Sequence, residues 1–172
     1  MLKNENITLR AVEPEDLEFL YQCENLPSLW AYGNRKEPFS RFALKEYVSN
    51  CDQTIYERGQ LRFMVVFNGT NETIGTVDLF NFDYHNGRAE TGIFIVENFQ
   101  RRGYGLQTLQ LLTDYAFNLL NIHQLYAFVV KENSAAAKLF HKAGFEHNAT
   151  LKNWFFHKGE YWHTDIFQKF KK

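Results

Sequence analysis

The chain has 172 residues, about the length of one domain, which is enough to bury a core without disulfides or metal ions. Its 19 basic and 20 acidic residues give a net charge of −1, which argues against nucleic acid as the main partner because no strongly basic surface is available for phosphates. Residues 1–10 do not resemble a secretory signal, and no apolar stretch approaches the roughly 20 residues of a membrane helix. We therefore expect one cytoplasmic domain, residues 1–172, without membrane contact.

The first 50 residues predict one strand and two helices. Residues 7–10 have strand character, and Glu-Pro-Glu-Asp at 13–16 is typical of a helix start. Proline fits the first helical turn, and acidic residues favour the positive end of the helix dipole. The prolines and the glycine within 26–40 predict an irregular segment, and a second helix is expected over about 41–50.

Three strands are expected next. Residues 62–67 are rich in β-branched and aromatic residues, and residues 73–82 alternate loosely. The third strand is expected over 89–96, which ends in the β-branched run 93–96. The polar segments 68–72 and 83–88 both contain glycine and predict turns.

The segment 97–105, Glu-Asn-Phe-Gln-Arg-Arg-Gly-Tyr-Gly, is the most informative part of the chain. Apolar residues recur at helical spacing after it, so we expect a helix over about 103–119. A glycine-rich turn at a helix start presents unpaired backbone N–H groups at the positive end of the dipole, which favours a phosphate. The alternative is a turn that needs Gly103 and Gly105 for its geometry alone.

The C-terminal third predicts a strand, a helix and a hairpin. Residues 124–130 form a short apolar strand, and a helix over 134–142 is expected to begin at Asn133 as N-cap and to end before Gly144. Residues from 145 return to strand. Lys-Gly at 158–159 predicts the turn between strands over 153–157 and 161–170.

The order of these elements, β-α-α-β-β-β-α-β-α-β-β, predicts a mixed α/β domain of the α+β class. Its sheet is mostly antiparallel and is opened by one β-loop-α-β unit. The only cysteines, Cys23 and Cys51, and the six histidines show no spacing typical of a disulfide framework or a metal site, so we expect no metal.

The glycine spacing narrows the class of anion. Gln100-x-x-Gly103-x-Gly105 differs from the G-x-G-x-x-G dinucleotide fingerprint and lacks the Gly-Lys-Ser/Thr ending of nucleotide-triphosphate loops. It resembles the pyrophosphate-binding loop of the GNAT N-acetyltransferases, whose pattern is Gln/Arg-x-x-Gly-x-Gly/Ala. In that family the loop holds the diphosphate of acetyl-coenzyme A.

A second motif supports the resemblance. Residues 133–145, Asn-Ser-Ala-Ala-Ala-Lys-Leu-Phe-His-Lys-Ala-Gly-Phe, resemble the family's Asn-x-x-Ala-x-x-Leu-Tyr-x-x-x-Gly-Phe stretch. The resemblance covers essentially the whole chain and implies the GNAT fold, a mixed, mostly antiparallel sheet flanked by helices, with splayed central strands. Residues 9–17 and 155–165 resemble the branch that contains ribosomal-protein N-terminal acetyltransferases and bacterial spermidine N-acetyltransferases, the latter somewhat more closely.

The resemblance implies acetyl-coenzyme A as the acetyl donor. Backbone groups of the third strand would bind its pantetheine arm, and one N–H near Phe94 would polarise the acetyl carbonyl. Amides of the loop would hold its diphosphate, and Asn133 would reach it while also capping a helix. The cofactor-binding residues implied in this way are Gly92, Ile93, Phe94, Ile95, Gln100, Arg101, Arg102, Gly103, Tyr104, Gly105, Asn133, Lys138 and Phe140.

The reaction needs a base near the acetyl group, and family members often place a glutamate at the start of the central strand. Glu90 is therefore the expected catalytic base, acting directly or through a water. The alternative is a carboxylate that only pairs with Arg88. Asp78, on the neighbouring strand, is a weaker candidate that we also place in the acceptor site.

The general acid is where this sequence departs from the family pattern. The tyrosine that protonates the leaving thiolate falls at Phe140, which has no proton to give. Ser134, Tyr126, Tyr161 or a water could donate, or the thiolate could leave unassisted, since a thiol pKa is about 8.5.

The acceptor is expected to be a small-molecule or peptide amine. The segment 32–38 corresponds to an acidic stretch in the spermidine enzymes but keeps only Glu37. A polyamine such as spermidine, a protein N-terminus and a small amine all stay open, as does a protein that binds acetyl-coenzyme A without catalysis. The aromatic C-terminal hairpin fits either a core or the surface of a homodimer.

Overall fold

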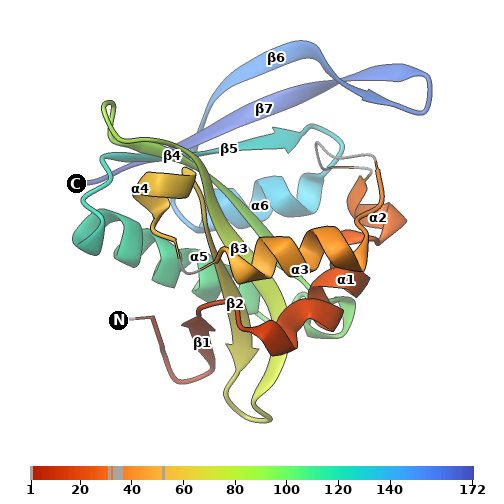
Figure 1. Cartoon of the computed structure of the whole chain (residues 1–172). Helices are drawn as coiled ribbons and strands as arrows, with labels where there is room; N and C mark the ends of the chain where they lie inside the picture. Colours follow the sequence, from red (N-terminus) through yellow and green to blue (C-terminus); the bar gives the residue numbers. More distant parts are fainter. Residues whose placement is uncertain (1, 31, 33–36, 52) are drawn as a thin grey trace.

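The computed structural model describes residues 2–30, 32, 37–51 and 53–172. It contains a seven-stranded sheet in the order β1-β2-β3-β4-β5-β7-β6 (Figure 1). The strands are β1 (Ile7–Arg10), β2 (Leu61–Phe67), β3 (Glu72–Asp83), β4 (Arg88–Ile95), β5 (Gln124–Val130), β6 (Glu146–His157) and β7 (Glu160–Phe170). Among these described strands the pairing is antiparallel except between β4 and β5, which are parallel.

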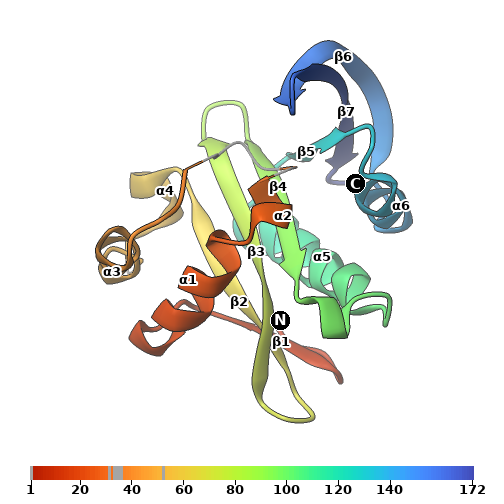
Figure 2. The same ribbon diagram turned by 90° about the vertical axis from the view of Figure 1, so that its right-hand side faces the viewer.

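Helices cover both faces of the sheet. Figure 2 shows α1 and α3 on one face and α5 on the other, with α6 beside the β5–β7 part of the sheet. The α-helices are α1 (Leu17–Glu24), α2 (Pro27–Trp30), α3 (Arg41–Ser49), α4 (Ile55–Arg58), α5 (Tyr104–Asp114) and α6 (Ser134–Lys142). None of the helices in the described part of the chain is long and apolar enough to cross a membrane.

The core is divided by the sheet into a larger and a smaller cluster. Alternate residues of β2 and β3, such as Val65 and Val77, pack with Leu109 and Leu112 of α5. On the opposite face, Met64 packs with Val12 and with Leu20 of α1. The face that carries α1 and α3 has fewer buried apolar side chains, and a pocket lies there between α1, α3, β2 and β3.

The predicted fold class and the central β-loop-α-β unit are confirmed. The strand over 124–130 and the helix over 134–142 have the expected bounds. Asn133 caps α6, Gly144 has a φ of 84°, and Lys158 and Gly159 form the hairpin turn with φ of 47° and 87°.

Two short helices were not expected. The segment 26–40 contains the short helix α2, and α4 precedes β2 where no helix was expected. Both helices have only four residues, too few to show an apolar periodicity. The helix expected over about 103–119 is present as α5, Tyr104–Asp114, and it continues as a π-helical turn over Tyr115–Leu119. Residues 33–36 lie outside the described residues, so the expected irregular segment is not covered there.

Candidate active site

The two central strands separate along their length. β4 and β5 pair at Arg88–Gln124, Ala89–Leu125 and Glu90–Tyr126, and the pairing stops there although both strands continue. From Thr91 to Ile95, the edge of β4 that faces β5 is therefore not used by that strand. Such an edge can pair with an extended ligand as if the ligand were an added strand.

The alternation of backbone groups along β4 shows which residues face β5. Gly87 accepts a backbone hydrogen bond from Gln124 of β5 at 3.0 Å, and Val96 donates to Ile74 of β3 at 2.9 Å. Odd-numbered residues of β4 therefore direct their N–H and C=O groups toward β5, and even-numbered residues toward β3. The Phe94 N–H therefore points toward β3, although the oxyanion donor was expected near Phe94. The adjacent Ile93 is the residue whose N–H faces the open side.

The loop after β4 has the backbone geometry of an anion site. Arg101 and Gly103 have left-handed φ values of 58° and 86°, and the first N–H groups of α5 have no intrahelical acceptor. The Gln100 side chain donates from Nε2 to the Ile95 carbonyl at 2.8 Å, which fixes the loop to the end of the strand. Gly105 serves packing, since a Cβ there would lie 3.3 Å from Leu139 of α6.

Aromatic contacts hold the same loop against β2. The Tyr104 ring lies 5.3 Å from that of Phe67 and 6.0 Å from that of Phe99, and the Arg102 guanidinium lies 5.7 Å from the Phe99 ring. The side chains of Tyr104 and Arg102 therefore have structural contacts of their own. Their expected contact with the cofactor stays a prediction.

Helix α6 supplies the remaining expected cofactor residues. Asn133 Oδ1 accepts a hydrogen bond from the Ala136 N–H at 3.1 Å, as expected of an N-cap, while Ser134 and Lys138 are exposed. Phe140 is only 4% exposed, and its ring lies 5.2 Å from Phe145 and 6.2 Å from Phe167. The position of the family tyrosine is thus filled here by a core side chain.

Glu90 lies where β4 and β5 begin to separate. It pairs with Phe80 of β3, so its side chain is on the face that carries α1 and α3, and only 6% of the residue is exposed. Burial raises the pKa of its carboxyl above the usual value, although Asn81 Nδ2 donates to Oε2 at 2.8 Å. Arg88 pairs instead with Asp83 at 3.1 Å, so the alternative of a Glu90–Arg88 pair is wrong.

Tyr126 lies directly opposite Glu90 in the last pair before the strands separate. Burial raises the pKa of its phenol, and the nearby Glu90 charge raises it further. Its ring packs edge to face on Phe128 at 5.7 Å. Of the residues expected to donate a proton, Tyr126 is therefore the one that lies beside the expected base.

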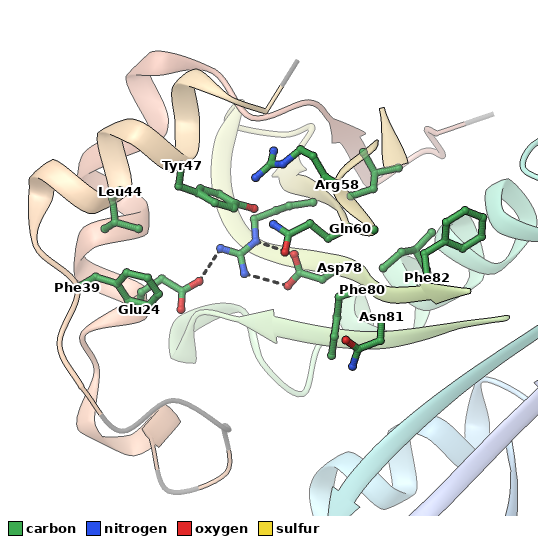
Figure 3. A pocket seen from close by; sticks show the side chains of 14 residues that line it. Glu24, Phe39, Leu44, Tyr47, Arg58, Gln60, Asp78, Phe80, Asn81 and Phe82 are labelled. Atoms are coloured by element: carbon green, nitrogen blue, oxygen red, sulfur yellow. Dashed lines mark hydrogen bonds and ion pairs between the residues drawn. The ribbon is translucent and has the colours of Figure 1, made fainter. Parts of the chain in front are cut away.

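A pocket of about 600 Å³ lies on this face of the sheet (Figure 3). It is lined by Glu24, Phe39, Leu44, Tyr47, Arg58, Gly59, Gln60, Leu61, Arg62, Asp78, Leu79, Phe80, Asn81 and Phe82. Asn81 connects it to Glu90 through their hydrogen bond. A Cβ on Gly92 would lie 3.4 Å from the Phe80 ring, so Phe80 also connects the pocket to the middle of β4.

Arg62 crosses the pocket wall between two carboxylates. Its Nε and Nη2 donate to Asp78 at 2.6 and 3.1 Å, and its Nη1 lies 2.5 Å from Glu24, as the dashed lines in Figure 3 show. Burial alone lowers the pKa of Arg62, but the charges of Asp78 and Glu24 outweigh it and hold the pKa above its usual value. Asp78 thus lines the pocket, with both oxygens bonded to Arg62. Its expected role in the acceptor site stays a prediction.

The other expected acceptor residue, Glu37, is an exposed residue of the segment before α3. The neighbouring positions 33–36 lie outside the described residues. Sequence reasoning missed Arg62, Phe80 and Asn81. The only available signal was the alternation of the strand over 73–82, which does not reveal which side chains meet those of other elements.

A family model described as an acetyltransferase (GNAT) domain matches residues 6–146. The chain is a GNAT N-acetyltransferase. A spermidine N(1)-acetyltransferase of Escherichia coli strain K12 is 33% identical over 156 residues, which cover 91% of this chain and 81% of the relative. The corresponding enzyme of Vibrio cholerae is 32% identical over 158 residues, 92% of this chain and 89% of the relative. A crystal structure of spermidine N-acetyltransferase from Vibrio cholerae in complex with CoA and spermine has a TM-score of 0.88 at 29% identity, and covers 97% of this chain and 96% of that one.

Enzymes of this family take the acetyl group from acetyl-coenzyme A. In this acetyltransferase, the open edge of β4 and the left-handed loop before α5 fit a donor with an extended amide arm and a diphosphate. The pocket between α1, α3 and the sheet opens beside the same strand, which fits an acceptor that arrives from the opposite side.

Proposed function

We propose that this acetyltransferase acetylates a primary amine that is bound in the pocket beside Glu90. The observation that carries the proposal is that the pairing of β4 and β5 ends at Glu90–Tyr126. A buried carboxylate, a phenol and the open edge of β4 therefore meet at one point. Acetyl transfer from a thioester requires that the donor carbonyl, the amine and a base be held in line at such a point.

Each step of the proposed transfer is assigned to a group near this point. Glu90 accepts the proton of the ammonium, directly or through a water, and the raised pKa of its carboxyl makes it a stronger base than an exposed glutamate. The Ile93 N–H faces the open side of β4 and polarises the acetyl carbonyl. Tyr126 is the proton donor to the leaving thiolate, and a thiol pKa of about 8.5 also lets the thiolate leave without help.

The acceptor is proposed as a class. The named relatives act on spermidine, which makes a polyamine one candidate, and a protein N-terminus is the other that the sequence left open. Free thiol is measured on mixing acetyl-coenzyme A with a panel of polyamines, small amines and N-terminal peptides. Turnover with at least one amine supports the proposal, and its absence across the panel contradicts it.

A second candidate is a protein that binds acetyl-coenzyme A without transferring the acetyl group. It is favoured by Phe140, which lies in the core where the family has a proton-donating tyrosine. Calorimetry that detects acetyl-coenzyme A binding, together with no thiol release from any amine, would support this candidate over the enzyme.

We also propose that the chain self-associates through its C-terminal hairpin. Trp154, Phe156 and Tyr161 of β6 and β7 are 63%, 55% and 63% exposed, more than expected of aromatic residues without a partner surface. Light scattering after size exclusion tests this, and a monomer at all concentrations would contradict it.

A further inference from the structure

The charges that line the acceptor pocket cancel one another. Among the described lining residues the carboxylates are Glu24 and Asp78, and both are bonded to Arg62. A second cation, Arg58, is held in the wall by the Asn50 carbonyl at 2.8 Å. Two negative and two positive groups leave this part of the pocket without net charge. Both oxygens of Asp78 and one oxygen of Glu24 are already bonded to Arg62.

Glu90 is a carboxylate next to the pocket that is not bonded to a cation among the described residues. Its hydrogen-bond partner in the described part of the chain is Asn81, a neutral amide, so the two side chains together carry a single negative charge. Asn81 has a left-handed φ of 49° and lies at the irregularity of β3 between Phe80 and Asp83. Asparagine tolerates this conformation better than most residues, and the irregular backbone lets its amide reach Glu90.

The rest of the wall is largely apolar. The pocket is lined by Phe39, Leu44, Phe80 and Phe82. The centre of the Phe82 ring lies 5.5 Å from that of Tyr56 and 6.5 Å from that of Tyr84. An acceptor that extends from Glu90 into the pocket therefore meets aromatic rings and two carboxylates that already share Arg62 as their counter-charge. A second ammonium group placed there loses water without gaining a net counter-charge.

We infer that the acceptor is an amine with one ammonium group and an apolar or aromatic body, and that Asn81 is the positioning residue that sets this preference. The inference rests on the proposed function, because it concerns the acceptor of the same reaction. The amide at position 81 orients the Glu90 carboxylate and keeps the charge beside the reacting nitrogen at one. The aromatic wall then selects the body of the substrate.

The first test compares acceptors with the unmodified protein. Thiol release is measured with 2-phenylethylamine and hexylamine against spermidine and putrescine, at one pH and one salt concentration. We expect kcat/KM to be about tenfold higher for the monoamines. An equal or higher value for spermidine, with turnover present, overturns this inference and leaves the proposed function intact. No turnover with any amine contradicts the proposed function itself.

The second test changes the charge at position 81. Asn81→Asp adds a carboxylate beside Glu90. We compare kcat/KM for spermidine with kcat/KM for 2-phenylethylamine, and we expect the first to rise about fivefold relative to the second. This is the effect expected of one added charge in a solvent-accessible site. The acid limb of the pH profile should also move to higher pH, because a second negative charge disfavours ionisation of Glu90.

Asn71→Asp is the matched control for this charge change. Asn71 also has a left-handed φ, 58°, and is exposed at the turn between β2 and β3, away from the pocket. It adds the same charge with the same backbone requirement, and should change neither the acceptor ratio nor the pH profile. Equal effects of the two variants, or no effect of Asn81→Asp on a protein with unchanged thermal unfolding, would overturn the role of Asn81.

Discussion

The two ends of β4 are built from different parts of the chain, and they are expected to bind different partners. At the C-terminal end, a donor would meet backbone groups supplied by nine consecutive residues, 97–105, in a loop that contains two left-handed residues. At the N-terminal end, an acceptor would meet side chains from α1, α3, β2 and β3 that converge around Arg62, Asn81 and Glu90. The first end is a local structure, whereas the second depends on the packing of four elements.

This difference predicts that the acceptor end contributes more to stability. Arg62 is 17% exposed and is the cation bonded to both Glu24 and Asp78, so Arg62→Ala leaves two partly buried carboxylates without this partner. We expect the free energy of unfolding to fall by about 3–5 kcal/mol, measured by urea denaturation.

Arg41→Ala is the control for this loss of charge. Arg41 pairs with Glu18 on the surface, where both side chains are more than half exposed. Its loss should change stability far less, because an exposed ion pair is screened by solvent. If the two variants unfolded at the same urea concentration, the acceptor end would not be held by its ion pairs.

Replacing Glu90 tests the chemistry at the same end. In Glu90→Gln the amide can still accept the Asn81 hydrogen bond, but it cannot take a proton. We expect kcat to fall by about 100-fold or more, with no change in the Kd for acetyl-coenzyme A. Glu72→Gln, at the exposed start of β3, serves as control and should keep full activity.

The pH dependence of the unmodified protein should report the same group. Burial raises the pKa of Glu90 above 4.5, and only the ionised carboxyl accepts a proton. Activity should therefore be lost as the pH falls through this raised pKa, and be present above it. Because Glu90→Gln has no carboxyl at this position, its residual activity should lack this acid limb. An unchanged limb in the variant would assign it to another group.

The contrast between the two ends also explains what the sequence could and could not predict. The loop was recognisable because Gln100, Gly103 and Gly105 are close in sequence, and their geometric roles require those residue types. Likewise, Asn133 and Gly144 marked both ends of α6 because capping is local.

The acceptor end left no comparable pattern. Arg62 and Asp78 are 16 residues apart, and Glu24 lies 38 residues before Arg62, so their meeting depends on the sheet register and on the packing of α1. Asn81 was missed because a strand pattern does not show where a backbone irregularity turns a side chain. Glu90 was found through the family resemblance, and its partner Asn81 required the fold.

A glycine substitution tests the donor end with a smaller effect. Gly103 has a φ of 86°, and a Cβ there has room, since its nearest neighbour would be Gln107 Nε2 at 3.8 Å. Gly103→Ala therefore introduces mainly backbone strain, about 1–2 kcal/mol. We expect this strain to displace the loop amides and to raise the Kd for acetyl-coenzyme A about tenfold, as measured by calorimetry.

Gly59→Ala is matched to this variant. Gly59 ends α4 with a φ of 68°, and nothing lies within 4 Å of the position of its Cβ. Gly59→Ala should introduce a similar backbone strain and a similar loss of stability. The affinity for acetyl-coenzyme A should not change. A tenfold loss of affinity in both variants would point to general destabilisation and not to a binding loop.

The smallest effect is expected at Arg102, where the donor end uses a side chain. Arg102 is exposed and lies over the Phe99 ring, so it remains close to the loop. Among the described residues it forms no ion pair. Its attraction to a diphosphate is screened over about 8 Å at physiological salt. Arg102→Ala should therefore weaken acetyl-coenzyme A binding about threefold at low salt and have little effect at about 0.5 M salt. A loss that persists at high salt would mean that Arg102 makes a directed, desolvated contact, and the donor end would then depend on side chains as the acceptor end does.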